Sequence, residues 1–234
     1  MQRFSPRLDI LPRPQQQLWP ELRQIPKHFV LYGGTAIALR LGHRASVDFD
    51  FFTNESFAPE KILSSLPLLA GAKVLQNVSQ TLTVTLDRSG GVKLSFFGGL
   101  SLGRIGEPEE TQDGVMVVAS TLDLAGTKAA VITQRAEAKD YIDLLALMVS
   151  GISLVQAMAA ARSIYGEQYN PLITLKSLTY FGDGDLHRLT PEQKSKLVKA
   201  ATQLRLELPE MPRVSASLSP RPKCPGAGSS SEPS

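Results

Sequence analysis

The stretch that most constrains the fold is Tyr32–Phe52, YGGTAIALRLGHRASVDFDFF. The apolar run at residues 28–32 and the pair Gly33 and Gly34 predict a buried strand that ends in a tight turn. The residues after the turn are helix formers, and residues 46–52 alternate between polar and apolar side chains, as a half-buried strand does. We therefore expect strand, glycine turn, helix and second strand to follow one another directly.

Asp48 and Asp50 lie two residues apart on the second predicted strand. Because successive side chains of a strand point to opposite faces, both carboxylates share one face, and Val47, Phe49 and Phe51 share the other. Two like charges side by side are unfavourable unless a cation neutralises them. Aspartate oxygens are suitable ligands for Mg²⁺ that carries a nucleoside triphosphate, so the pair is a candidate metal site.

The glycine turn is a candidate phosphate site. Glycine lets the backbone approach a ligand closely, and the free N–H groups at the start of the next helix attract anions. Arg40, His43 and Arg44 place cationic or hydrogen-bonding groups nearby, with His43 expected to be structural. The stretch is neither GxGxxG nor a Walker A sequence, so dinucleotide binding and P-loop chemistry lose support. Each feature alone also has a structural explanation, since Arg44 can simply neutralise Asp48.

The rest of the chain predicts an α/β (α+β) fold, in which a small mixed sheet with flanking helices precedes a C-terminal helical portion. Further strands are expected at residues 73–77, 81–87, 92–97 and 115–118, and further helices at 15–25, 56–69, 121–134, 137–149, 153–164, 170–180 and 191–206. We expect three parts: a core at residues 1–120, the helical portion at 121–212, and a disordered tail at 213–234 that is rich in Ser, Pro and Gly.

Composition excludes several classes of protein. The chain has 234 residues, 42% of them hydrophobic, which is enough for a core and excludes wholesale disorder. Its net charge of +3 does not by itself imply nucleic-acid binding. The single cysteine, Cys224, excludes a disulfide framework and a cysteine-built zinc site. With no signal-peptide pattern and no run of about 18 apolar residues, we expect a cytoplasmic protein without a membrane segment.

The order of strand, glycine turn, helix and Asp-x-Asp strand resembles the polymerase-β type of nucleotidyltransferase fold. The fuller string GGTAIALRLGHRASVDFDFF, residues 33–52, is similar to the AbiEii/AbiGii toxin-type nucleotidyltransferases of bacterial toxin–antitoxin and abortive-infection systems. Two later segments also match that family, namely residues 122–147, which include QRAEAKDYIDLLAL, and residues 169–185. The resemblance extends from about His28 to Asp185.

This resemblance implies a nucleoside triphosphate (NTP) as substrate and Mg²⁺ or Mn²⁺ as cofactor. It implies nucleotide binding by Gly33, Gly34, Thr35, Arg44 and Ser46, metal binding by Asp48 and Asp50, and catalysis by these two aspartates with Lys128 and Asp143. Lys128 is expected to contact the nucleotide phosphates. Asp143 is expected to orient Lys128 or to assist the acceptor, and Asp140 is the less favoured alternative for this acidic position.

Helix periodicity is compatible with such a site. Lys128 and Arg135 are seven residues apart and share one face of a predicted helix, and Asp140 and Asp143 share a face of the next. The lysine and the aspartates can therefore converge on one pocket. The alternative is that Lys139 pairs with Asp143 as an ordinary surface ion pair.

One position departs from the polymerase-β pattern, in which a third carboxylate stands on a later strand. The best candidate strand is 91–97, GVKLSFF, in which Lys93, Ser95 and Phe97 share one face. Ser95 or Lys93 therefore replaces the expected acid. Either the chemistry proceeds with two carboxylates and the pair of Lys128 and Asp143, or the protein has lost transfer activity.

We therefore expect a metal-dependent enzyme that transfers NMP from an NTP to a hydroxyl and acts as the toxin of a toxin–antitoxin pair. The resemblance gives RNA or tRNA as a candidate acceptor and a cognate antitoxin as a candidate partner. Two alternatives stay open. One is a catalytically degenerate nucleotide-binding module that acts through a partner, and the other is a nucleotidyltransferase that modifies a protein or a small molecule such as an aminoglycoside.

Overall fold

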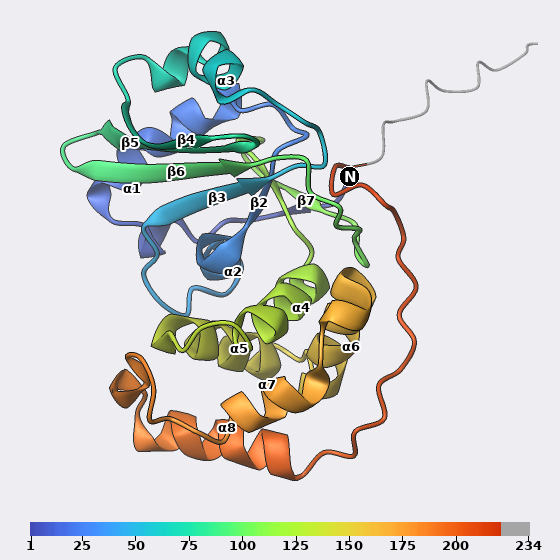
Figure 1. Ribbon diagram of the computed structural model, residues 1–234. Helices are drawn as coiled ribbons and strands as arrows, with labels where there is room; N and C mark the ends of the chain where they lie inside the picture. The colour runs from blue at the N-terminus through green and yellow to red at the C-terminus, as the bar shows by residue number, and fades with distance from the viewer. Residues whose placement is uncertain (221–234) are drawn as a thin grey trace, which may run out of the picture.

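The computed structural model describes residues 1–220, which contain one mixed eight-stranded sheet flanked by helices (Figure 1). The strands are β1 (Arg3–Phe4), β2 (Val30–Tyr32), β3 (Asp48–Phe52), β4 (Lys73–Val78), β5 (Thr81–Asp87), β6 (Gly91–Phe97), β7 (Glu109–Thr111) and β8 (Val117–Val118). Their order is β1-β7-β8-β2-β3-β6-β5-β4, with β3 antiparallel to β2 and parallel to β6. The predicted fold class is confirmed, and the short strands β1 and β7 are additions to the prediction.

Eight α-helices accompany the sheet within the described residues. They are α1 (Arg13–Leu18), α2 (Gly33–Leu41), α3 (Pro59–Ser65), α4 (Thr121–Val131), α5 (Ala138–Val149), α6 (Leu154–Tyr165), α7 (Pro171–Ser177) and α8 (Pro191–Thr202). Figure 1 shows α4–α8 as a helical half below the sheet half, with α2 between them. The predicted helices at 15–25 and 56–69 are shorter, because 3-10 turns that contain Pro20 and Pro67 interrupt them.

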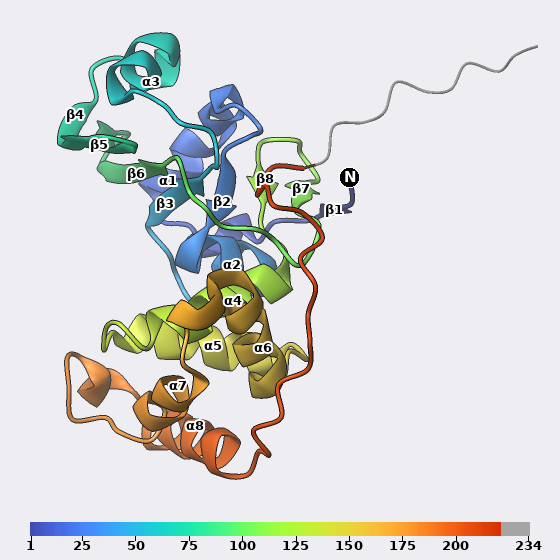
Figure 2. The same cartoon turned by 45° about the vertical axis from the view of Figure 1, so that its right-hand side comes forward.

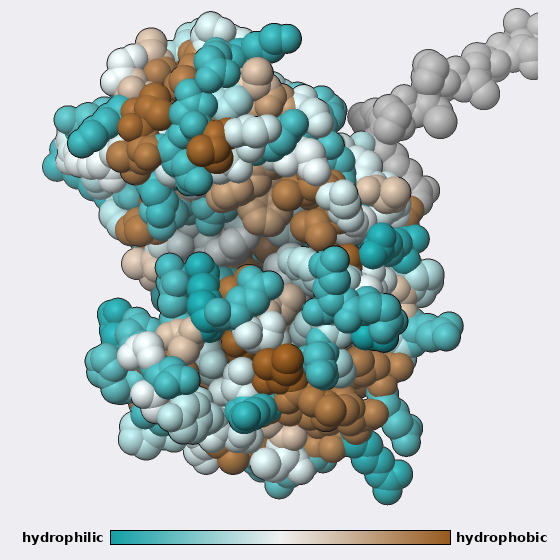
Figure 3. All heavy atoms as spheres, in the orientation of Figure 1, coloured by the Kyte–Doolittle hydropathy of each residue, from teal (hydrophilic) through white to brown (hydrophobic). Residues whose placement is uncertain are grey.

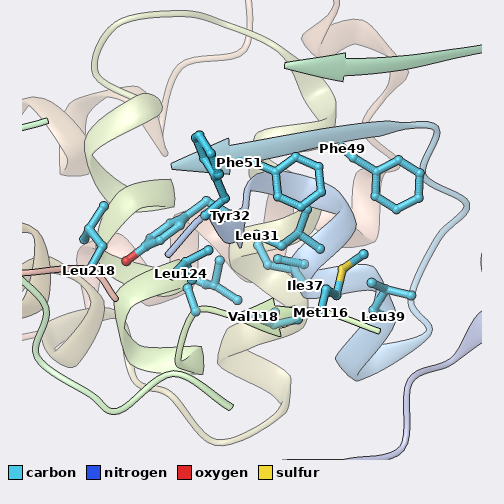
Figure 4. Packing of buried hydrophobic residues seen from close by; sticks show 14 of the residues in the cluster. Leu31, Tyr32, Ile37, Leu39, Phe49, Phe51, Met116, Val118, Leu124 and Leu218 are labelled. Atoms are coloured by element: carbon cyan, nitrogen blue, oxygen red, sulfur yellow. The ribbon is translucent and has the colours of Figure 1, made fainter. Parts of the chain in front are cut away.

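The alternation of β3 divides the sheet into a core face and a polar face. Phe49 and Phe51 are fully buried among the apolar side chains shown in Figure 4. Asp48 and Asp50 alternate with them and are only partly buried, so both carboxylates lie on the opposite face, as predicted. Val47, expected on the apolar face, precedes the strand and is 49% exposed, so that part of the prediction is wrong.

Residues 213–220 lie against the sheet half after the chain has run back from α8 (Figures 1 and 2). The buried Arg104 donates from Nη1 to the carbonyl of Ser217 at 2.5 Å, and the N–H of Leu218 donates to Asn54 Oδ1 at 2.5 Å. This order differs from the predicted disorder, because these hydrogen bonds and the burial of Leu218 in the hydrophobic core hold the segment. The rest of the predicted tail lies outside the described residues.

The surface mixes hydrophilic and hydrophobic residues, and Figure 3 shows a brown, hydrophobic patch on the helical half. Large apolar residues exposed on this half include Val149 at 76% and Leu172 at 60%. Among residues 1–220, no single helix has the length and hydropathy needed to cross a bilayer. Helix α5 and residues 154–168 meet those criteria only as a pair, and a bend of 116° separates them.

Helices α4 and α6 pack closely because small residues line their contact. A Cβ atom added at Gly126 would lie 2.9 Å from both the carbonyl carbon and the Cβ of Ala160, closer than real contacts allow. Ala157, Ala160 and Ala161 of α6 are fully buried. The two helix backbones therefore approach to a distance that only glycine at position 126 permits, and this approach fixes α4 in the helical half.

We predict that Gly126→Ala lowers the free energy of unfolding by about 1–3 kcal/mol, as overpacked cores do. The usual gain of roughly 1 kcal/mol from replacing a helix glycine by alanine is already contained in this net loss. Urea denaturation followed by circular dichroism measures the change. Combining the variant with Ala160→Gly should restore only part of the stability, because the carbonyl carbon of residue 160 stays in place. Unchanged or increased stability of Gly126→Ala would contradict the close packing.

Candidate functional site

A cavity of about 590 Å³ lies between the polar face of the sheet and helices α4 and α5. Its volume is within the range of ordinary small-molecule sites. Among the residues predicted for the site, those that line the cavity are Gly33, Gly34, Thr35, Arg44, Ser46, Asp48, Asp50 and Lys128. Asp143 is fully buried and lies directly behind Lys128 and Arg44, which it contacts. The structure thus brings the predicted residues together in one place.

The parallel pairing of β3 with β6 decides what stands beside the two aspartates. Asp48 pairs with Lys93, and Asp50 pairs with Ser95. Lys93 Nζ lies 3.0 Å from Asp48 Oδ2, so Lys93 and not Arg44 neutralises Asp48. Burial, with the charge of Asp48 added, raises the pKa of Asp50. Ser95 and Lys93 do occupy the positions next to the aspartates where a third carboxylate was expected.

The glycine turn opens helix α2 directly beside these carboxylates. Gly33 has a φ of +75°, and a Cβ there would lie 2.8 Å from Asp50 Oδ2. A Cβ at Gly34 would lie 2.2 Å from Arg44 Nη2 and 3.0 Å from Asp143 Oδ2. No side chain of the N-cap residue caps α2, whose first N–H groups are therefore available to an anion. The absence of a Cβ atom thus lets Asp50 approach Gly33 and lets Arg44 approach Gly34.

Thr35 and Ser46 tie the start of α2 to the start of β3. Thr35 Oγ1 donates to the carbonyl oxygen of Asp48 and lies 2.7 Å from Ser46 Oγ. Both hydroxyl side chains are buried. The hydroxyl proton of Thr35 is thus used within the protein, so these two residues fix the position of the glycine turn relative to Asp48. Nucleotide binding by Thr35 stays a prediction, for which its backbone N–H at the start of α2 is the available group.

Lys128 of α4 is 5% exposed and stands between two aspartates of α5. Its Nζ lies 2.6 Å from Asp140 Oδ1 and 2.8 Å from Asp143 Oδ2. Both carboxylates bind the lysine, so Asp140, the less favoured alternative, has the same kind of contact with Lys128 as Asp143 has. An ammonium group has three donors, and these two ion pairs leave one for a group in the cavity.

Asp143 also joins the helical half to the loop between α2 and β3. Arg44 binds it in a bidentate manner, with Nε 2.7 Å from Oδ1 and Nη2 2.9 Å from Oδ2. His43 Nε2 lies 2.7 Å from Oδ1. Burial by itself would raise the pKa of Asp143, but these hydrogen bonds and the charge of Lys128 hold that pKa well below its ordinary value. Asp143 is therefore a fully engaged carboxylate.

Asp140 has a second cationic partner at the edge of the cavity. Arg135 Nε lies 2.8 Å from Asp140 Oδ2. Burial opposes ionisation, yet the hydrogen bond from Arg135 and the charge of Lys128 keep the pKa of Asp140 below its ordinary value. Lys139 pairs with Glu137 at 2.8 Å, so the alternative of a surface pair with Asp143 is wrong.

Some residues were not placed correctly from the sequence. Arg40, expected beside the glycine turn, binds Glu109 at 2.5 Å and is not among the residues that line the cavity. The partners of Lys93 and Arg135 were not predicted, whereas the hydrogen bond of His43 to Asp143 agrees with its expected structural role. Only the spacing of Arg135 from Lys128 offered a signal, because an ion pair between distant segments leaves no local pattern.

Asp48 and Asp50 fit a Mg²⁺ site of the type that combines one or two carboxylates with water and substrate phosphates. The ammonium of Lys93 already makes the contact with Asp48 that a bound cation would make. The close approach of Asp50 to Gly33 keeps the second carboxylate beside the N-terminus of α2. In residues 1–220, no group of three or more His, Cys, Asp or Glu side chains is arranged to hold a metal. The other ligands would thus come from phosphate and water.

Comparisons with known proteins define the class first. A crystal structure from H. pylori that is provisionally described as a nucleotidyltransferase superimposes with a TM-score of 0.51 and 16% identity, covering 81% of this chain and 90% of the other. This likeness shows the fold. An uncharacterized protein of Aquifex aeolicus (strain VF5) is 36% identical over 158 residues, which are 66% of this chain and 74% of the relative.

The family follows from the sequence profile. Residues 21–218 match the family described as nucleotidyl transferase AbiEii toxin, type IV toxin–antitoxin system. The chain belongs to the AbiEii nucleotidyltransferase toxin family and is a nucleotidyltransferase. The matched range contains every residue of the cavity described above.

We predict that the buried carboxylates of Asp140 and Asp143 make the free energy of unfolding depend on pH in the acid range. The folded pKa values of Asp140 and Asp143 lie below the ordinary 3.8. Their contribution is complete above about pH 4 and is lost as the pH falls below 3.8, because the unfolded chain then binds protons that the folded protein does not. Free energies of unfolding between pH 2.5 and 6 should fall toward acid.

Asp143→Asn should lower the free energy of unfolding near pH 6 by about 3–5 kcal/mol and make its fall toward acid less steep, by up to about 1.4 kcal/mol per pH unit. Glu192→Gln is the matched control, since Glu192 forms an exposed pair with Lys196 and should leave the pH profile nearly unchanged. Equal slopes for the wild-type protein and Asp143→Asn would show that the carboxylate does not keep its depressed pKa.

Proposed function

We propose that the protein transfers a nucleoside monophosphate from an NTP to an acceptor hydroxyl. The hydroxyl oxygen bonds to the α-phosphorus, the bond from that phosphorus to the bridging oxygen breaks, pyrophosphate leaves, and the hydroxyl proton is released to water. The observation that carries the proposal is the convergence in one cavity of Asp48 and Asp50, the open N-terminus of α2, and the buried Lys128.

Each of these groups has a distinct proposed role. Asp48 and Asp50 would hold Mg²⁺ or Mn²⁺, which when bound would neutralise and orient the triphosphate. The first N–H groups of α2, which begins at Gly33, are proposed to bind the leaving pyrophosphate, and the absence of a side-chain cap from Tyr32 supports this role. The remaining donor of Lys128 supports a contact with a phosphate oxygen.

Asp143 is proposed to act by positioning and not by proton transfer. Its two oxygens accept from His43, Arg44 and Lys128, and its pKa is well below the ordinary value. A carboxylate so engaged is a weak base. Asp143 therefore holds Lys128 and Arg44 at the cavity wall, and Arg44 in turn closes the wall beside the glycine turn.

The family supports a role as the toxin of a type IV toxin–antitoxin system, with a cognate antitoxin as its partner. We propose RNA, including tRNA, as the acceptor and the bacterial cytoplasm as the place of action, since NTP and RNA are both found there. We propose that Ser95 or Lys93, standing on β6 in place of a third carboxylate, lowers the rate of transfer and leaves nucleotide binding intact.

We predict that Asp48→Asn reduces transfer roughly a hundredfold or more, because the bound metal supplies several kcal/mol of transition-state stabilisation. Purified protein, each labelled NTP, Mg²⁺ and total tRNA form the assay, with label on RNA as the readout. Asp87→Asn is the matched control, since Asp87 ends β5 in a hairpin and its Oδ1 accepts from the N–H of Gly90 at 3.0 Å.

Full transfer by Asp48→Asn would contradict the metal role of this carboxylate. Tight binding of Mg²⁺ and nucleotide by the wild-type protein without transfer to RNA, protein or aminoglycoside would instead favour the nucleotide-binding module. Label found on a protein or on the aminoglycoside, and not on RNA, would identify that molecule as the acceptor.

A further inference from the structure

The polar face of the sheet continues beyond Asp48 and Asp50 as far as the edge strand β4. Because β3, β6, β5 and β4 are neighbours, directly paired residues form rows across all four strands. The first row contains Asp50, Ser95, Thr83 and Gln76, and the second contains Asp48, Lys93, Thr85 and Lys73. Gln76, Thr83, Lys93 and Ser95 also line the cavity. The site thus has an extension that the proposed nucleotide contacts do not use.

The side chains of this extension are either basic or polar and uncharged. Strands β4, β5 and β6 contain a single acidic residue, Asp87, which is committed to the hairpin turn through Gly90. The rows beyond β3 offer hydroxyl and amide groups together with two lysines. A polycationic acceptor would meet two ammonium groups here without a carboxylate to bind them, whereas an anionic acceptor would find partners.

Lys93 differs from the other cations of the cavity in its partner. Lys128, Arg44 and Arg135 bind the fully buried Asp140 or Asp143, and Lys139 pairs with Glu137. Lys93 binds Asp48, whose side chain is 35% exposed and belongs to the proposed metal site. A divalent cation and the Lys93 ammonium would compete for the same carboxylate, and like charges so close repel. Occupation of the metal site would therefore release Lys93 toward another anion.

Strand order places this released ammonium on the acceptor side. Strand β3 has β2, which leads into the glycine turn of α2, on one side and β6, with Lys93 and Ser95, on the other. In phosphoryl transfer the attacking and leaving oxygens lie roughly in line on opposite sides of the phosphorus. With pyrophosphate leaving at α2, the acceptor hydroxyl approaches from β6.

We propose that Lys93 binds a phosphate group of the acceptor next to the attacking hydroxyl, and that Thr83 and Gln76 extend this acceptor subsite toward the sheet edge. This inference rests on the proposed function. It selects a phosphate-bearing acceptor such as an RNA end, and it excludes a polycationic small molecule. Lys73, at the end of the second row, provides a further cation for the next phosphate.

The first experiment compares two fluorescent RNA oligonucleotides with a free 3′ hydroxyl. One has a native last phosphodiester and the other a neutral methylphosphonate there. Anisotropy is measured with Mg²⁺ and a non-hydrolysable NTP analogue. The wild-type protein should bind the native probe about tenfold more tightly, corresponding to one charged contact. Lys93→Met should lose this preference and Lys93→Arg should keep it. Lys196→Met, which removes a lysine of α8, is the matched control and should retain it.

The second experiment uses Mn²⁺ alone and does not depend on activity. Calorimetric titration should show several-fold tighter Mn²⁺ binding by Lys93→Met than by the wild-type protein, because the competing ammonium is gone, and no change for Lys196→Met. Equal affinities would overturn the competition between Lys93 and the metal. Circular dichroism checks that each variant is folded. If Lys93→Met does not fold, Lys93→Arg, which keeps the positive charge, is compared with the wild-type protein instead.

The outcomes separate this inference from the proposed function. Equal binding of both probes by the wild-type protein, or a full preference in Lys93→Met, would overturn the acceptor subsite while nucleotide binding and transfer stand. Absence of Mg²⁺-dependent nucleotide binding in the wild-type protein would instead contradict the proposed function. The Mn²⁺ titration would still show whether Lys93 competes with a metal ion for Asp48.

Discussion

The rest of the site depends on the two buried ion pairs that the ammonium group of Lys128 makes with Asp140 and Asp143. Removing three charges from water costs several kcal/mol each, and attraction offsets that cost only when nearly every hydrogen bond is made. Here Arg44 and His43 complete the bonds of Asp143, and they come from the loop between α2 and β3. The network therefore joins the helical half to the sheet half, and it sets where Lys128 stands relative to the carboxylates of β3.

The same network explains the second glycine of α2, Gly34, while the first, Gly33, is required by its φ of +75° and the approach of Asp50. The guanidinium of Arg44 reaches Asp143 by passing within 2.2 Å of where a Cβ of Gly34 would lie. Thr35 then ties the turn to the backbone of Asp48. The proposed phosphate binding and the observed ion-pair geometry impose the same requirement on this turn, namely that the backbone carry no side chain at its start. The close packing that the glycines permit is thus also what the proposed phosphate site needs.

Local pattern was sufficient for much of this site and insufficient for its charge pairing. Alternation placed Asp48 and Asp50 on one face, and helix periodicity brought Lys128 toward the aspartates of α5. The partner of Arg44 could not be read in this way, because Asp48 is nearer in sequence than Asp143 and only the tertiary fold decides between them. The order of residues 213–220 was likewise not predicted from their Ser-containing sequence, because the burial of Leu218 in the core and the hydrogen bonds of Arg104 and Asn54 with backbone groups are contacts between distant segments.

Two carboxylates on one face need compensation even without a metal, and the chain provides it from β6. Lys93 neutralises Asp48 through an ion pair, while burial and the charge of Asp48 raise the pKa of Asp50, which a hydrogen bond from Ser95 partly offsets. A third acid at position 95 would add a like charge beside Asp50 and deepen the repulsion. Ser95 and Lys93 together therefore make the pair of carboxylates tolerable on one face of the sheet.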